Sequence, residues 1–372
     1  MTSRIKAARK EREWSQTRLI SELELVAGRR GDTLPSRETM KSRVSRWENG
    51  HVKPDEFYRR LLREALGMDD RELGFEVYVD EPTVVAADEL LAKLAADPAV
   101  DDNLLGALRA QTDAIRRQDR QYGAGTLLEQ MRIHVDNVET HLSHTVFESA
   151  RRPLAVVLAD AAALAGWQAL DVVATDQAWR SFETASGAAR QAEDPALYAF
   201  ARMEQAHVLT ELEQPGTAAD LAESVWSETH SAVAPVVRCW LAAATAEMLA
   251  GHARGGDALA MIARAESEAD AFEDDRPPYL VFNAVHLDRW IGHTLVKLAD
   301  PAAERRLRQA ADDMDGSFMR ASASLQLDLY CALTQNGQKD EASEHLRRAE
   351  QLARTIGSRR QLARLRRLRA AS

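Results

Sequence analysis

Cysteine is scarce in this sequence. Only two cysteines occur in 372 residues, Cys239 and Cys331, and they lie far apart without a neighbouring ligand or redox motif. A disulfide scaffold needs paired cysteines, so a reducing compartment is favoured and we expect a cytoplasmic protein. The residues that follow Met1 also lack the apolar stretch that opens a secretory signal.

Long apolar runs and catalytic motifs are missing as well. No uninterrupted apolar run approaches the roughly 18 residues that a membrane helix needs, so no membrane partner is predicted. The sequence contains no phosphate loop, nucleophile elbow or catalytic dyad, and its scattered Asp and Glu are typical of solvated helix faces. We therefore predict that the protein is not an enzyme and uses no cofactor.

The charge is distributed unevenly along the chain. The net charge is −10, but residues 1–53 contain 13 Lys and Arg against 7 Asp and Glu, a net of +6. The remaining residues contain 35 Lys and Arg against 51 Asp and Glu, a net of −16. A basic head on an acidic body suits a head that neutralises phosphates and a body that does not.

The first 75 residues predict a small helical head. The first helix is expected at residues 3–13, and Ser15 is a suitable N-cap for the second. A third helix is expected to end near Asn49, with Gly50 as its stop signal. The fourth is expected to begin at Pro54. Leucine and aromatic residues at helical spacing supply its apolar face: Phe57, Leu61, Leu62 and Leu66.

Two short motifs in the head carry a family resemblance. Ser15-Gln16 opens the second helix, and Val44-Ser45-Arg46-Trp47-Glu48-Asn49-Gly50 closes the third. In this order they resemble the helix-turn-helix of lambda-repressor/Cro-type (XRE-type) regulators. The loop between the two helices is lengthened and is marked by Gly28, Gly31 and Pro35. This loop resembles an actinobacterial group of such regulators that carries a tetratricopeptide-like helical repeat body.

The lengthened loop leaves the start of the third helix open. Either Ser36 caps the helix, or residues 36–40 form a separate short turn.

The resemblance implies that the third helix lies in the major groove of double-stranded DNA. Arg43 and Arg46 would then contact bases, since Arg can bond guanine bidentately, and Gln16 would bind a phosphate. The full set of implied DNA-binding residues is Gln16, Arg37, Lys41, Ser42, Arg43, Ser45, Arg46, His51 and Lys53. The residues alone also permit an ordinary solvated basic face on a helix anchored by a buried Trp47.

The rest of the chain predicts an all-α fold. We expect the head to span residues 1–76, a connector with one short helix (86–95) to span 77–100, and a helical body to span 101–372. Helix breakers recur in the body about every 40 residues, with shorter turns midway between them. The breakers are Pro153, Pro195, Pro235, Pro277-Pro278 and Gly316, and the shorter turns lie at 214–216, 255–256, 300–301 and 336–337. This pattern indicates an α-solenoid of tetratricopeptide-like helical hairpins.

Three further features of the body each have two interpretations. His134, His141 and His144 could bind a metal from one helical face, but no paired metal motif accompanies them, so packing is favoured and no metal is predicted.

The arginine-rich run at 359–369 suits an acidic or nucleic-acid partner or, as we prefer, a terminal capping helix. Most of the body's tryptophans are expected in the core, with one or two in a ligand groove: Trp167, Trp179, Trp226, Trp240 and Trp290.

These features predict a sequence-specific DNA-binding transcriptional regulator that forms a homodimer. Its helical repeats would bind a regulatory small molecule or peptide, or hold the dimer together. Gram-positive pheromone receptors have a similar architecture, and the resemblance implies a ligand in the repeats. The alternative is a helical-repeat scaffold for protein–protein interaction, with the head as a docking module.

Overall fold

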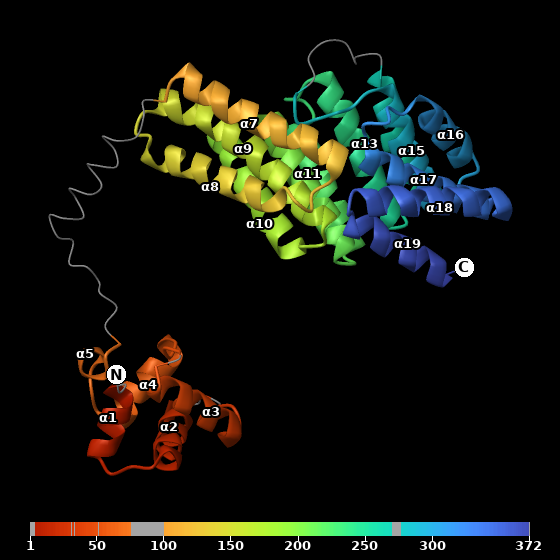
Figure 1. Cartoon of the computed structure of the whole chain (residues 1–372). Helices are drawn as coiled ribbons and strands as arrows, with labels where there is room; N and C mark the ends of the chain where they lie inside the picture. Colours follow the sequence, from red (N-terminus) through yellow and green to blue (C-terminus); the bar gives the residue numbers. More distant parts are fainter. Residues whose placement is uncertain are drawn as a thin grey trace. The chain divides into compact units, whose positions relative to one another are not determined.

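The computed structural model describes residues 4–75 except 31, 33 and 51, then residues 100–269 and 277–371. All regular elements in these ranges are helices, which confirms the all-α prediction (Figure 1). The chain divides into two compact units, Met1–Ala92 and Lys93–Ser372. The predicted connector helix at 86–95 lies outside the described residues.

The first unit is a small helical bundle. Its helices are α1 (Arg4–Glu11), α2 (Gln16–Arg30), α3 (Arg37–Glu48), α4 (Glu56–Leu66) and α5 (Asp70–Leu73). One apolar cluster joins them, with Leu19, Leu23, Val44, Leu61 and Leu62 fully buried at its centre. Apolar residues at three- and four-residue spacing bury one face of each helix from α1 to α4, so the bundle follows from the apolar periodicity.

Local side-chain caps decide where the helices of this unit begin. Ser36 caps α3, since its Oγ accepts a hydrogen bond from the backbone N of Thr39 at 3.4 Å, which settles the choice that the sequence left open. The predicted start of α4 at Pro54 is wrong. Asp55 is the N-cap, and its carboxylate accepts a hydrogen bond from the backbone N of Tyr58 at 3.1 Å. An aspartate side chain accepts such a bond and proline does not, so the helix begins at Glu56, two residues after Pro54.

The loop predicted from Gly28 is also shorter than expected. Helix α2 continues through Gly28 to Arg30, because Val26 and Ala27 extend its buried face by a further turn. A glycine in the exposed last turn costs less than this burial stabilises.

The second unit is a series of helices that pack as successive hairpins, coloured from orange to blue in Figure 1. They are α7 (Asp102–Tyr122), α8 (Leu128–His144), α9 (Glu148–Asp171), α10 (Thr175–Gln191), α11 (Pro195–Glu211), α12 (Pro215–Thr229), α13 (Pro235–Gly251), α14 (Gly255–Ser267), α15 (Ala284–Lys297), α16 (Ala302–Asp313), α17 (Met319–Gln335), α18 (Lys339–Thr355) and α19 (Arg359–Ala371). Pro195, Pro215 and Pro235 each open a helix, where the missing N–H has no intrahelical role.

Pro153 is not a helix breaker, contrary to the prediction. It lies inside α9, which begins at Glu148. A proline this close to the helix start removes only the hydrogen bond to the exposed Ser149, so the helix accommodates it. Among the described helices, α9 alone has the length and apolar composition of a membrane span, and 78% of its apolar window is buried inside the protein, as in a core helix.

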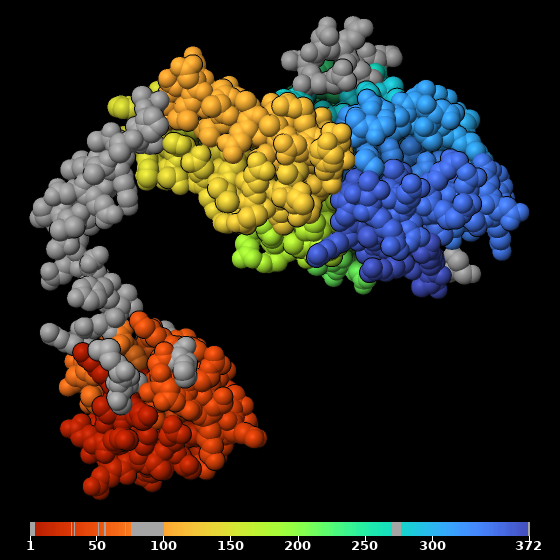
Figure 2. Space-filling view, in the orientation of Figure 1, coloured from red at the N-terminus to blue at the C-terminus, as the bar shows by residue number. Residues whose placement is uncertain are grey.

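The two ends of the second unit pack against each other. Arg320 of α17 forms ion pairs with Asp119 of α7 at 2.9 Å and with Asp171 at the end of α9 at 3.0 Å. Ser358 donates a hydrogen bond to the same Asp171 at 2.6 Å. Figure 2 shows the orange and yellow residues of α7 and α8 against the dark blue C-terminal helices. The hairpins therefore surround an internal space.

Candidate functional site

Helix α3 has one buried and one polar face. Met40, Val44 and Trp47 are buried in the core of the first unit, as the spacing of Val44 and Trp47 predicted. Lys41, Ser42 and Arg46 are exposed on the opposite side. Lys41 and Arg46 have no hydrogen-bond or ion-pair partner in the described part of the chain, so both cations are available to another molecule.

A buried polar network holds α3 against α1 and α2. The carboxylate of Glu48 is almost fully buried and accepts hydrogen bonds from Arg9 Nη2 and Gln16 Nε2, each at 2.9 Å. Burial alone would raise the pKa of Glu48, but these hydrogen bonds lower it below its ordinary value. The signature Ser15-Gln16 and the signature glutamate thus meet in space and set the position of the exposed face.

The other sequence-predicted DNA-binding residues have different surroundings. Arg37 is paired with Glu24, with Nη2 to Oε2 at 2.5 Å. Arg43 donates to the Tyr58 hydroxyl, and its Cζ lies 5.0 Å from the centre of the Tyr58 ring. Ser45 is half-buried and Lys53 is exposed. His51 lies outside the described residues.

The second unit contains a cavity of about 520 Å³. Its lining comes from α7 and from α9, α11, α13, α15, α17 and α19, together with the segment at 279–281. In the part of the chain that the structure describes, α8, α10, α12, α14, α16 and α18 contribute no lining residue. Alternate helices of the hairpins therefore face inward, which is how a helical solenoid produces an inner surface.

Aromatic rings form much of the cavity wall. The ring centre of His207 lies 6.5 Å from that of Trp167 and 5.7 Å from that of Trp290. Phe200 packs against Trp240 at 5.2 Å and against Tyr279 at 5.1 Å. Three of the five body tryptophans thus line the cavity, where the sequence predicted one or two in a groove.

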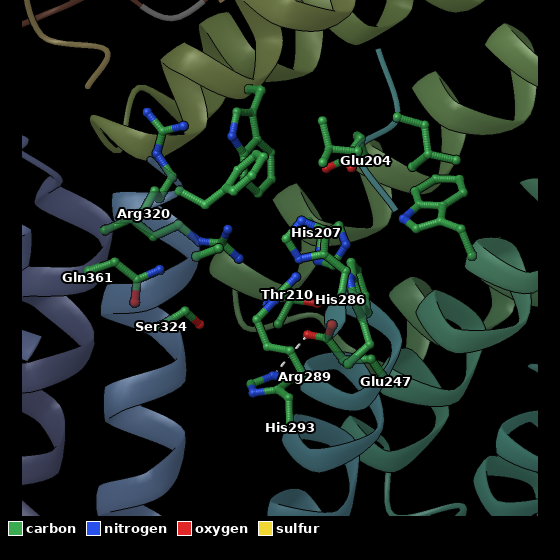
Figure 3. Close-up of a pocket in the computed structure, with 18 of the residues that line it drawn as sticks. Glu204, His207, Thr210, Glu247, His286, Arg289, His293, Arg320, Ser324 and Gln361 are labelled. Carbon is green, nitrogen blue, oxygen red and sulfur yellow. Dashed lines mark hydrogen bonds and ion pairs between the residues drawn. The ribbon is translucent and has the colours of Figure 1, made fainter. Parts of the chain in front are cut away.

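Most charged groups in the cavity are already paired. Lys297 Nζ lies 3.0 Å from Glu247 Oε1, and the same carboxylate oxygen bonds His293 Nε2 at 3.2 Å. Arg360 pairs with Glu211 at 2.6 Å, and Arg364 pairs with Asp328. Figure 3 shows Arg320, Ser324 and Gln361 on one side of the cavity and Glu204 across from them, with His207, His286 and Arg289 between.

Burial shifts the pKa of several lining groups, among them Glu204, His207 and His286. Burial raises the pKa of Glu204 to about 8, and Oε2 of this carboxyl has no hydrogen-bond partner among the described residues. Burial lowers the pKa of His207 to about 4 and that of His286 to about 4, so both imidazoles are neutral at pH 7. Buried groups with perturbed pKa values in a cavity are typical of a functional site.

The remaining sequence-predicted features are placed as follows. His134 is buried, and its Nε2 lies 2.9 Å from Thr112 Oγ1, so it packs inside the hairpin rather than beside His141 or His144. The arginine-rich run forms α19, whose Leu365 is buried. The sequence missed that Arg360 and Arg364 of this run face the cavity; their four-residue spacing was the available signal.

Comparison with known proteins identifies no family. No protein-family model and no curated protein matches this sequence. Among solved structures, the chain is similar to the crystal structure of Bacillus thuringiensis PlcR in complex with the peptide PapR7 and DNA. The identity is 14% and the TM-score 0.40, over 91% of this chain and 97% of that chain. No residue role follows from a likeness at this level, and nothing in it supports the actinobacterial group suggested by the sequence.

Proposed function

We propose that the protein is a cytoplasmic, sequence-specific DNA-binding transcriptional regulator, and that the cavity of its helical body binds a regulatory small molecule or peptide. The observation that carries the first part is the polar face of α3. Its cations Lys41 and Arg46 project from a helix whose other face is anchored by Met40, Val44 and Trp47. A rigid helix that presents unpaired Arg and Lys suits the major groove and its phosphates.

The proposed contacts divide into two kinds. Arg46 and Arg43 contact bases, and Arg43 must first leave the Tyr58 hydroxyl that it contacts in the free protein. Lys41, Ser42 and Lys53 contact the DNA backbone, together with Gln16 at the start of α2, whose Nε2 also donates to Glu48. Ser45, Arg37 and His51 complete the proposed interface, and Arg37 must first exchange its Glu24 partner for a phosphate.

The test is DNA affinity measured on sites selected from genomic fragments. Arg46→Ala should weaken the selected site by about 1–3 kcal/mol and relax preference at one base pair, because a bidentate contact to guanine is lost. Arg60→Ala, which removes an equally exposed arginine from α4, should change affinity little.

Equal affinity for all fragments in wild type and both variants would contradict DNA recognition by α3. That outcome would favour the scaffold alternative, in which the head docks a protein.

We further propose a homodimer, because one head of this size offers few phosphate contacts and two heads engage two half-sites. Light scattering of the full chain should then give about twice 41.3 kDa. A mass of one chain at the concentrations that bind DNA would argue against this arrangement.

A further inference from the structure

Two guanidinium groups on the cavity wall have no carboxylate partner. Arg120 of α7 and Arg289 of α15 form no ion pair with any described residue. Arg120 lies over the Phe318 ring, with its Cζ 5.6 Å from the centroid, and Arg289 lies 5.4 Å from the ring of Trp290. Nε of Arg289 is buried without a hydrogen-bond partner in the described ranges.

The buried His286 belongs to the same part of the wall. Its ring packs edge-on against Phe318 at 5.1 Å, and the charges of both Arg289 and Arg120, after burial, help to lower its pKa. Its Nδ1 is a further buried atom with no hydrogen-bond partner among the residues described. His286, Arg120 and Arg289 therefore form one cluster, which we call the cationic wall.

The positive charge of the cationic wall is only partly offset elsewhere in the cavity, where Arg320 pairs with two carboxylates. The other inward-facing arginines and the lysine each have a carboxylate: Arg116 with Asp160, Lys297 with Glu247, Arg320 with Asp119 and Asp171, Arg360 and Arg367 with Glu211, and Arg364 with Asp328. Glu204 stays protonated near pH 7 because burial raises its pKa to about 8. Arginine keeps its charge away from water, so a guanidinium without a carboxylate costs free energy until an anion pairs with it.

We propose that the cavity binds a small organic monoanion. The acidic group of this ligand contacts the cationic wall, chiefly Arg289, and its apolar, ring-containing body lies between Trp167, Trp240 and Trp290. This inference deepens the ligand-binding part of the proposed function and rests on it. An anion supplies the missing partner of the guanidiniums, and aromatic walls match an apolar body. A cavity of about 520 Å³ holds one molecule of that kind.

The contact between the two ends of the body favours a small molecule over an extended chain. Arg320 links α17 to α7 and α9, and Arg360 links α19 to α11. These ion pairs border the cavity where the groove of an open solenoid would run on. An extended peptide would have to cross this border.

The experiment compares two probes with nearly the same ring system and different charge. Anilinonaphthalene sulfonate is an apolar anion, and N-phenylnaphthylamine is its uncharged analogue. Both are titrated into the full-length protein and followed by energy transfer from tryptophan, since Trp167, Trp240 and Trp290 line the cavity. We expect saturable binding of the anion at one site per chain.

The variants separate the charge from the cavity. In Arg289→Gln the anion should bind roughly 10- to 150-fold more weakly, which is what a lost hydrogen bond to a charged group produces. The uncharged probe should bind as in wild type. Arg254→Gln, which removes an arginine paired with Glu223 and Asp257 away from the cavity, should change neither probe.

The melting temperature supplies a second readout. Removal of an unpaired, half-buried charge should leave the melting temperature of Arg289→Gln unchanged or higher, whereas a merely structural arginine would lower it. Should this variant fail to fold, Arg120→Gln takes its place. An unchanged anion affinity in the folded variant, or an equal loss for both probes, would overturn the proposal. DNA affinity is measured separately, so failure of the head as a DNA-binding domain would leave this result standing.

Discussion

At the scale of single residues, burial without an ion-pair partner raises the pKa of the Glu204 carboxyl. It lies on α11 at 5% exposure, and burial raises its pKa to about 8 from an ordinary value of 4.5. Arg360 opposes this rise and Glu247 adds to it. The folded state therefore holds a proton that the unfolded chain releases near pH 4.5, and Glu204 lowers stability increasingly as the pH rises from about 4.5 to about 8.

Glu204→Gln should remove this pH dependence. The amide cannot ionise. The free energy of unfolding of the variant, relative to wild type, should therefore rise by roughly 1.4 kcal/mol for each pH unit between about 4.5 and 8, and should not rise further above pH 8. Urea denaturation near pH 6 and near pH 8 measures the difference. Glu183→Gln, at an exposed position of α10, should track wild type at both values. If the free energy of unfolding changes equally between the two pH values in all three proteins, Glu204 is ionised in the folded state.

Single-residue predictions from sequence succeeded where one local rule applies. The N-cap at Ser15 is confirmed, since its Oγ accepts a hydrogen bond from the backbone N of Arg18 at 3.0 Å. The four-residue spacing of Arg360 and Arg364 places them on one helical face, but it does not show that this face meets the cavity. That depends on where α19 lies against α11 and α9, whose Glu211 and Asp171 are 149 and 187 residues away from their partners Arg360 and Ser358. The partners of Arg43 and Arg37 are only 15 and 13 residues away, and they were missed because they depend on how α3 packs against α4 and α2.

At the scale of elements, the hairpins of the body share one turn. The second residue after the helix end has a positive φ at Val173, Glu193, Glu213, Ala253 and Ala299, and at Gly337 and Gly357. Glycine favours this left-handed conformation, yet only the last two positions have it. The helical period was therefore predictable from breakers and apolar spacing, whereas most of these turns carry no glycine signal. Tertiary packing imposes them.

Val173 tests how much strain packing imposes. A non-glycine residue in this conformation costs about 1–2 kcal/mol, and the added chain entropy of glycine costs about 0.5–1 kcal/mol. Val173 has φ 66 and is 46% exposed, so Val173→Gly should raise the free energy of unfolding by about 0.5–1 kcal/mol.

The neighbouring Val172 is the matched control. It has φ −91, is free of this strain and is half-buried, so Val172→Gly should lower stability by at least about 0.5–1 kcal/mol. Changes of the same sign in the two variants, measured by urea denaturation, would show that strain at Val173 is negligible.

At the scale of the second unit as a whole, the sequence predicted the solenoid but not its closure. Repeats of helical hairpins predict an open superhelix with a concave groove. The closure depends on contacts such as Arg320–Asp119, which join residues 201 positions apart. No periodic pattern in the sequence predicts such a pair, because Asp and Arg at these positions are also typical of a solvated helix face. The cavity, its buried carboxyl and its unpaired arginines all follow from this closure.

Arg320→Met should therefore be among the most destabilising single changes in the body. Asp119 and Asp171 have side chains that are 3% and 2% exposed, and loss of Arg320 leaves both carboxylates without their shared cation. Breaking a buried pair in this way costs about 3–5 kcal/mol. Arg132→Met removes an arginine that also pairs with two carboxylates, Glu129 and Asp136, but all three are exposed, so it should change stability little. Thermal denaturation of the two variants compares the same substitution at the contact between the two ends of the body and at an exposed position. If they melt together, the ends of the body are held by their apolar contacts and the ion pairs only border the cavity.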